Sequence, residues 1–146
     1  MKTQLSKNFT LDEFLESEID AKDDSFINTI QDDSHIDNLQ ALCANLLQPL
    51  RNALGIALSI SSGYRCPELN EAAQGEDNSQ HTKGQAADVY CKRQFIPIDI
   101  ARMVVSLRLD FDQMILYPTF VHLSYTTERK NRKQILYNKL YKGENV

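Results

Sequence analysis

Near the C-terminal end of the chain, residues 112–125 read DQMILYPTFVHLSY, with Pro118-Thr119 between two largely apolar runs. Both runs have the length of β-strands, and the dipeptide between them suits a short turn. In the second run, alternation places His122 on the opposite face from Val121 and Leu123. The segment therefore predicts a short antiparallel hairpin of two strands, 112–117 and 120–125.

The first part of the chain predicts mainly helix. Thr10 and Glu13 have the spacing of a capping box, which opens a short helix through about Ser17. From residue 36 to 54, apolar residues recur every three or four positions, as an amphipathic helix requires. Pro49 should kink or interrupt this helix, and Gly55 should end it.

Shorter elements follow. The patterns predict strands at 58–62, at 85–91 and around 135–137, and helices at 67–73 and from Pro97. Residues 18–34, which are acidic and polar, and the polar residues 74–83 predict loops. Helices first and strands afterwards indicate an α+β domain, in which helices pack on a small antiparallel sheet.

The 146 residues fit one domain, 1–146, with a basic tail from about residue 128. A net charge of −4 argues against a nucleic-acid partner, and we expect a monomer. No apolar run approaches the ~18 residues of a membrane helix, and no secretory signal is visible, so we expect a cytoplasmic protein. Three widely spaced cysteines fit reduced thiols in that compartment.

Asp88 interrupts the apolar strand predicted at 85–91, where an unpaired carboxylate would be costly to bury. It therefore needs a cation, and a metal ion is one candidate. His81 lies seven residues earlier, with Gly84 between them to let the loop turn back, and His122 belongs to a neighbouring strand. Two imidazoles and one carboxylate, with a fourth position left open, are the ligand set of a catalytic zinc.

The same three residues also allow a purely structural interpretation. In that case His81 caps a loop, His122 is a satisfied core histidine and Asp88 pairs with an arginine. The spacing of His81 and Asp88 does not decide between the two interpretations.

Three strings together resemble the zinc D-Ala-D-Ala carboxypeptidase family. They are SGYRCPELN at residues 62–70, NSQHTKGQAAD at 78–88 and FVHLSY at 120–125. This family includes phage and bacterial peptidoglycan endopeptidases. It is related in fold to the hedgehog signalling domain and to the vancomycin-resistance D-Ala-D-Ala dipeptidases. The resemblance implies a hedgehog/DD-peptidase-like fold over most of the chain.

The resemblance also implies roles for individual residues. Zinc would be held by His81, Asp88 and His122. Arg65 matches an arginine that the family places near the substrate, where it would act in catalysis and binding by pairing with a carboxylate or a polarised carbonyl. Ser79 matches the motif serine, and it would either hydrogen-bond near the metal and substrate or hold the loop.

The sequence departs from the family at the general base. Family members usually carry an acidic residue a few positions before the last histidine, and here Tyr117 stands about there. A phenol is a poor base at neutral pH, but it could bind substrate by donating a hydrogen bond to an oxyanion. Asp112 is one candidate for the base, with Glu68 and Glu71 as others.

We therefore expect a zinc-dependent metallopeptidase that cleaves peptidoglycan stem or cross-link peptides, as a carboxypeptidase or an endopeptidase. Without a visible secretory signal, a phage or prophage lysin would reach the cell wall only if released by another route. The alternative is a catalytically impaired, zinc-stabilised domain that binds peptidoglycan or another peptide.

Overall fold

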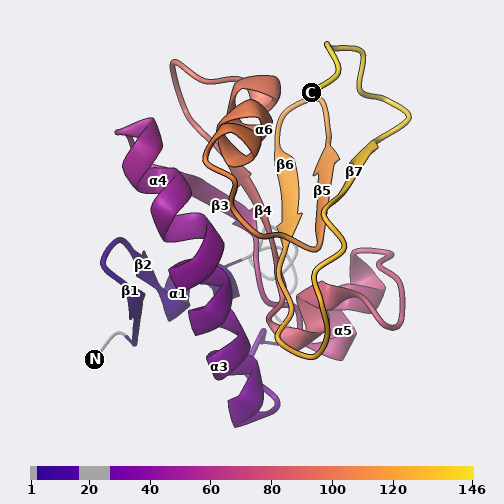
Figure 1. The fold of residues 1–146 in the computed structure, drawn as a ribbon. Helices are drawn as coiled ribbons and strands as arrows, with labels where there is room; N and C mark the ends of the chain where they lie inside the picture. Colours follow the sequence, from indigo (N-terminus) through magenta and orange to yellow (C-terminus); the bar gives the residue numbers. More distant parts are fainter. Residues whose placement is uncertain (1–2, 17–26) are drawn as a thin grey trace.

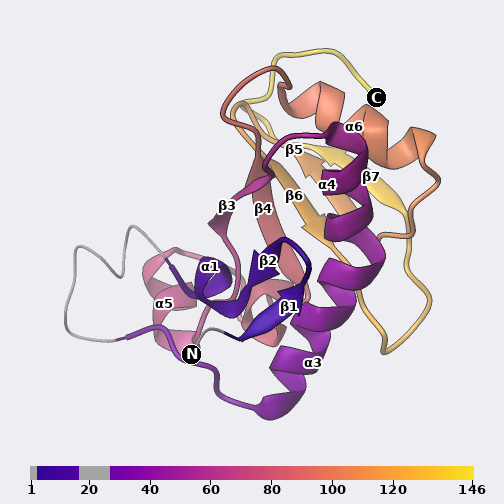
Figure 2. The same cartoon turned by 90° about the vertical axis from the view of Figure 1, so that its left-hand side faces the viewer.

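The computed structural model describes residues 3–16 and 27–146, and most of the loop predicted at 18–34 lies outside these residues. A single five-stranded sheet forms the centre of the molecule, and helices pack against one of its faces (Figures 1 and 2). None of the helices in the described part of the chain is long and apolar enough to cross a membrane. The architecture is the α+β arrangement that the sequence predicted.

The strands of this sheet lie in the order β3-β4-β6-β5-β7. Their bounds are β3 (Ser59–Ser62), β4 (Ala86–Tyr90), β5 (Gln113–Leu116), β6 (Val121–Ser124) and β7 (Gln134–Tyr137). Neighbouring strands are antiparallel except β5 and β7, which are parallel. All five predicted strands are confirmed, and the sheet is mostly antiparallel as expected.

A small hairpin of β1 (Gln4–Ser6) and β2 (Phe9–Thr10) precedes the helices and was not predicted. The helices are α1 (Leu11–Leu15), α3 (Asp33–Leu42), α4 (Gln48–Leu54), α5 (Pro67–Ala72) and α6 (Pro97–Ser106). A π-helical turn, η1 (Cys43–Leu47), joins α3 to α4, and a 3₁₀ turn, η2 (Gln80–Lys83), precedes β4.

The long helix passes Pro49 without ending. In a regular α-helix the proline ring would clash with the carbonyl four residues earlier, at Asn45. Here the chain widens into η1 just before the proline, and the Gln48 N–H bonds the Cys43 carbonyl five residues back. This π turn gives the ring room, so the predicted interruption becomes a change of helix type. The helix ends at Gly55 in the left-handed conformation, as predicted.

Strand alternation divides the sheet into a core face and an open face. Val89, Leu123 and Met114 are fully buried against the helices on the core face. Asp88 and His122, which are direct cross-strand partners, lie on the open face. The core therefore packs on the side of the sheet away from the polar side chains that the sequence singled out.

The basic C-terminal segment is part of the domain rather than a free tail. β7 pairs with β5. The loop before β7 is anchored because Arg129 and Arg132 donate hydrogen bonds to the buried Asp112. The last residues fold back towards α6, where Arg102 pairs with Glu144.

Replacing Gly84 by alanine should destabilise the fold far more than replacing Gly55. Both glycines have φ near +73°, which costs an alanine about 1 kcal/mol. Only at Gly84 would a Cβ also run into the His35 carbonyl oxygen, adding about 2 kcal/mol, whereas the space around Gly55 is open. Urea unfolding of Gly84→Ala and Gly55→Ala measures the difference, and equal losses would contradict it.

Candidate metal centre

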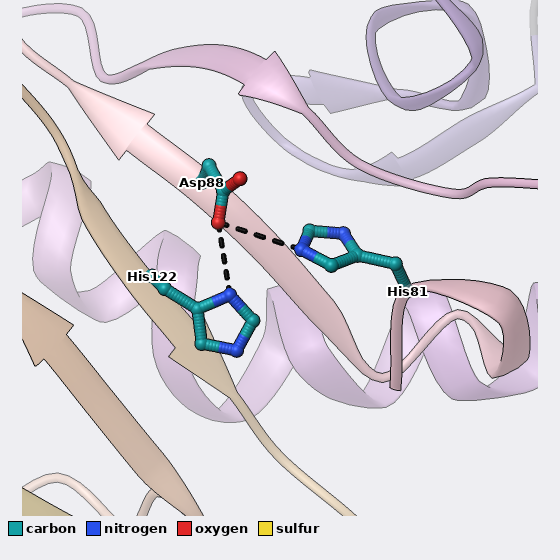
Figure 3. A group of neighbouring side chains, drawn as sticks. All are labelled: His81, Asp88 and His122. Atoms are coloured by element: carbon teal, nitrogen blue, oxygen red, sulfur yellow. Dashed lines mark hydrogen bonds and ion pairs between the residues drawn. The ribbon is translucent and has the colours of Figure 1, made fainter. Parts of the chain in front are cut away.

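His81, Asp88 and His122 meet on the open face of the sheet, and Figure 3 shows both imidazoles turned towards the carboxylate. We call these three residues the His–Asp–His cluster. Each offers one potential ligand atom, and the three atoms lie within 4.8 Å of one another. The Asp88 Oδ1 atom is 2.9 Å from His122 Nδ1 and 3.4 Å from His81 Nε2. Side chains far apart in sequence thus form one compact donor set.

The His81 imidazole is held in its neutral form, with Nε2 as the nitrogen that could bind a metal ion. Its Nδ1 lies 2.7 Å from the Gly63 carbonyl oxygen. Because a carbonyl can only accept, Nδ1 carries the proton and Nε2 keeps its lone pair facing Asp88. Burial lowers the pKa of His81, which favours this neutral form. A backbone carbonyl that accepts from the second ring nitrogen is the usual support of a metal-binding histidine.

Asp88 remains ionised despite its burial. Burial disfavours its charge, but the hydrogen bond from His122 Nδ1 at 2.9 Å helps to hold the pKa of the carboxyl well below its usual range. One anionic oxygen and two imidazole nitrogens fit a transition-metal ion such as zinc. They fit Mg²⁺ or Ca²⁺ less well, because those ions prefer a shell of oxygen ligands.

Arg65 lies beside the cluster, with its Nη2 atom 3.8 Å from Asp88 Oδ2. Its Nε–H donates to Ser62 Oγ at 3.1 Å, and Nη1 donates to Asn70 Oδ1 at 3.5 Å. Its backbone N–H donates to the His81 carbonyl at 3.0 Å. Asp88 therefore has an arginine neighbour, as the structural interpretation expected, as well as the two imidazoles of the metal interpretation.

Ser79 caps the turn that carries His81. Its hydroxyl accepts from the His81 backbone N–H at 3.2 Å, and its carbonyl accepts from the Thr82 hydroxyl at 2.6 Å. Of the two roles considered for Ser79, these contacts favour holding the loop.

Tyr117 lies close to the cluster and to Arg65. Its ring stacks on Phe120, with 4.3 Å between centroids and 14° between planes. Burial raises the pKa of the phenol, the Asp88 carboxylate raises it further, and the Arg65 guanidinium lowers it. The Tyr117 hydroxyl therefore stays protonated near neutral pH and is available as a donor.

Asp112 does not have the environment of a general base. It is fully buried, and its two oxygens accept hydrogen bonds from the guanidinium groups of Arg132 and Arg129 at 2.7–3.0 Å. They also accept from the Arg132 backbone N–H at 3.0 Å and from Gln80 Nε2 at 3.1 Å. The bonds from Arg132 are the main reason that the pKa of Asp112 lies well below its usual range. The geometry therefore corrects the role expected for Asp112: it anchors the loop before β7.

Several side chains that support the site had no role assigned to them from the sequence. Ser62 and Asn70 hold the guanidinium of Arg65. Asn28 donates to the Tyr64 carbonyl at 2.7 Å and accepts from the Cys66 N–H at 2.8 Å, so it fixes the loop on both sides of Arg65. These are polar residues without periodicity, and only the folded chain brings them together.

A family model described as Peptidase M15 matches residues 7–133. This protein belongs to the peptidase M15 family. The match includes the whole His–Asp–His cluster, and this family of metallopeptidases has the hedgehog/DD-peptidase fold that the sequence resemblance implied. No curated protein sequence matches the chain.

We expect this M15 protein to bind about one zinc ion per chain through the His–Asp–His cluster. His81→Ala and His122→Ala should each lose most of the metal, because either change removes one of three ligands. His35→Ala is the matched control, since the third histidine of the chain lies outside the cluster. Metal analysis after dialysis measures the content, and unchanged zinc in both cluster variants would exclude this assignment.

Asp112→Ala should lower the free energy of unfolding by about 2 kcal/mol, because Arg132 N–H and Gln80 lose their buried acceptor. The pKa of the Asp112 carboxyl is lower in the folded protein than in the unfolded chain, where it is ~3.9. The stability that Asp112 contributes is therefore fully present above pH ~3.9 and is lost as the pH falls through the pKa of the folded state. Asp110→Ala, at a half-exposed carboxylate, should cost less than about 1 kcal/mol. Equal unfolding midpoints for the two variants at pH 7 would contradict the anchoring role.

Proposed function

We propose that this M15 protein is a zinc-dependent peptidase that hydrolyses peptide bonds in the stem or cross-link peptides of peptidoglycan. The observation that carries the proposal is the His–Asp–His cluster, which offers two imidazoles and one carboxylate as ligands in a metallopeptidase family. When bound, zinc would polarise the scissile carbonyl and lower the pKa of water towards ~7.

The residues around the cluster support substrate binding and charge stabilisation. Arg65 is held in place by Ser62 and Asn70, so its guanidinium is already oriented beside Asp88. There it would pair with a substrate carboxylate or with the polarised carbonyl through charge-assisted hydrogen bonds. The protonated Tyr117 phenol would donate a hydrogen bond to the oxyanion that develops at the scissile carbon.

A second candidate function follows from the environment of Asp112 and the identity of Tyr117. The oxygens of Asp112 are occupied by arginines, and a tyrosine stands where the family usually has an acid. Among the described residues, Asp88 is the one carboxylate of the cluster, and as a metal ligand it would not be available as a base. These features favour, as the alternative, a zinc-stabilised domain that binds peptidoglycan without hydrolysing it.

The biological setting belongs to the same proposal. In it, the protein is a monomeric lysin that is made in the cytoplasm of a phage-infected or lysogenic cell and is released to the wall by a separate route. Its partner would be the peptide portion of the cell wall.

Incubation of the zinc-loaded protein with purified sacculi should release new amino termini, and a chelator should stop the release. His122→Ala should reduce the rate at least about 100-fold, because the cluster loses a ligand. Labelling of free amino groups over time measures the reaction. Sedimentation of the wild-type protein with sacculi, without any release, would favour the binding domain instead.

Tyr117→Phe tests the hydrogen-bond donor within the same assay. Loss of one oxyanion donor should lower kcat about 100-fold with a small change in KM. Tyr137→Phe is the control, because this half-exposed tyrosine lies on β7 and bonds the C-terminal Val146. Equal kcat values for Tyr117→Phe and wild type would remove the phenol from the mechanism.

A further inference from the structure

A single row of cross-strand neighbours crosses the open face of the sheet through the cluster. From β3 to β7 the paired residues are Ser62, Asp88, His122, Ile115 and Leu136. Directly paired residues on neighbouring strands present their side chains on the same face. The metal ligands of β4 and β6 therefore have a serine on one side of the row and two aliphatic side chains on the other.

The two halves of this row differ in chemistry. On the β3 side, Ser62 accepts a hydrogen bond from Arg65, which also lies 3.8 Å from Asp88. On the β5 and β7 side, Ile115 is partly buried and Leu136 is 37% exposed. We call Ile115 and Leu136 the apolar shelf. The open face is thus charged on one side of the cluster and apolar on the other.

Uncharged side chains border the shelf at both ends. At one end, Gln113 Nε2 donates to Gln134 Oε1 at 2.8 Å across β5 and β7. At the other end, Tyr117 and Phe120 stack on each other. Strand alternation places both pairs on the same face as Ile115. A charged group on the shelf would therefore lose water without gaining an oppositely charged partner there.

We propose that the apolar shelf is the subsite for the uncharged side chains of the substrate on one side of the scissile bond, an inference that rests on the proposed peptidase function. Strands lie about 4.8 Å apart, so Ile115 is one strand and Leu136 two strands from His122. An extended peptide advances about 3.4 Å per residue. A peptide crossing the sheet from the cluster would place its first residues over Ile115 and its next ones over Leu136. The shelf then selects apolar over acidic or basic residues, while Arg65 takes a carboxylate on the opposite side.

The test uses synthetic peptides that differ only at one position, about three residues from the cleaved bond on the side of the shelf, which holds Ala, Leu, Asp or Lys. The zinc-loaded protein should prefer the Ala and Leu peptides by about 10-fold or more in kcat/KM. Leu136→Lys should reduce that preference at least about 10-fold and should improve cleavage of the Asp peptide. Leu107→Lys is the matched control. Leu107 is 40% exposed, close to the value for Leu136, but it directly follows α6, a helix on the core side of the sheet away from the cluster. Equal effects of Leu136→Lys on all four peptides, or no effect, would overturn the proposal.

Binding separates failure of the shelf from failure of the peptidase. If the wild-type protein cleaves none of the peptides, the proposed hydrolysis fails, and the same peptides are titrated into the zinc-loaded protein while methyl resonances are followed. Shifts of the Ile115 and Leu136 methyl groups with the Leu peptide, but not with the Asp or Lys peptide, would support the shelf. Unshifted Ile115 and Leu136 methyl groups with every peptide would overturn it.

Discussion

The buried carboxylate of Asp88 on the interior strand β4 constrains the whole functional face of this protein. Burial raises the free energy of the charge, so the fold must surround it with positive or hydrogen-bonding groups. The loop after β3 brings the Arg65 guanidinium and β6 brings the His122 imidazole, and η2 adds the His81 imidazole beside them. The same concentration of groups around one oxygen donor is what makes the cluster suitable for a metal ion.

The position of His81 depends on close backbone packing outside the sheet. Its ring is fixed by the Gly63 carbonyl, and a Cβ at Gly63 would lie 2.7 Å from the Phe14 backbone. Because α1 packs this closely, Gly63 presents its carbonyl to the imidazole. Gly84 makes a second close approach, to the His35 carbonyl at the start of α3. The close packing of α1 against Gly63 and of α3 against Gly84 therefore helps to fix the orientation of the His81 imidazole.

Much of this arrangement was predictable because it follows from local periodicity. Short, largely apolar runs identified β4 and β6, and alternation placed His122 on the face opposite Val121 and Leu123 before any contact was known. Asp112 could not be interpreted in the same way. Its partners lie 17 and 20 residues later in an irregular loop, and no pattern in the sequence links a carboxylate to arginines that only tertiary folding brings together. β1 and β2 are three and two residues long, too short for alternation to identify them.

Strand register connects the metal cluster to the apolar shelf. A slip of one residue between β6 and its neighbours would turn His122 towards the helices and expose Val121 and Leu123. The buried core face therefore fixes the register, and this register places Asp88, His122 and Ile115 side by side. Packing of apolar residues on one side of the sheet thus determines which side chains adjoin the metal ligands on the other. Changes at Ile115 or Leu136 can alter what lies beside the cluster without disturbing the core that aligns it.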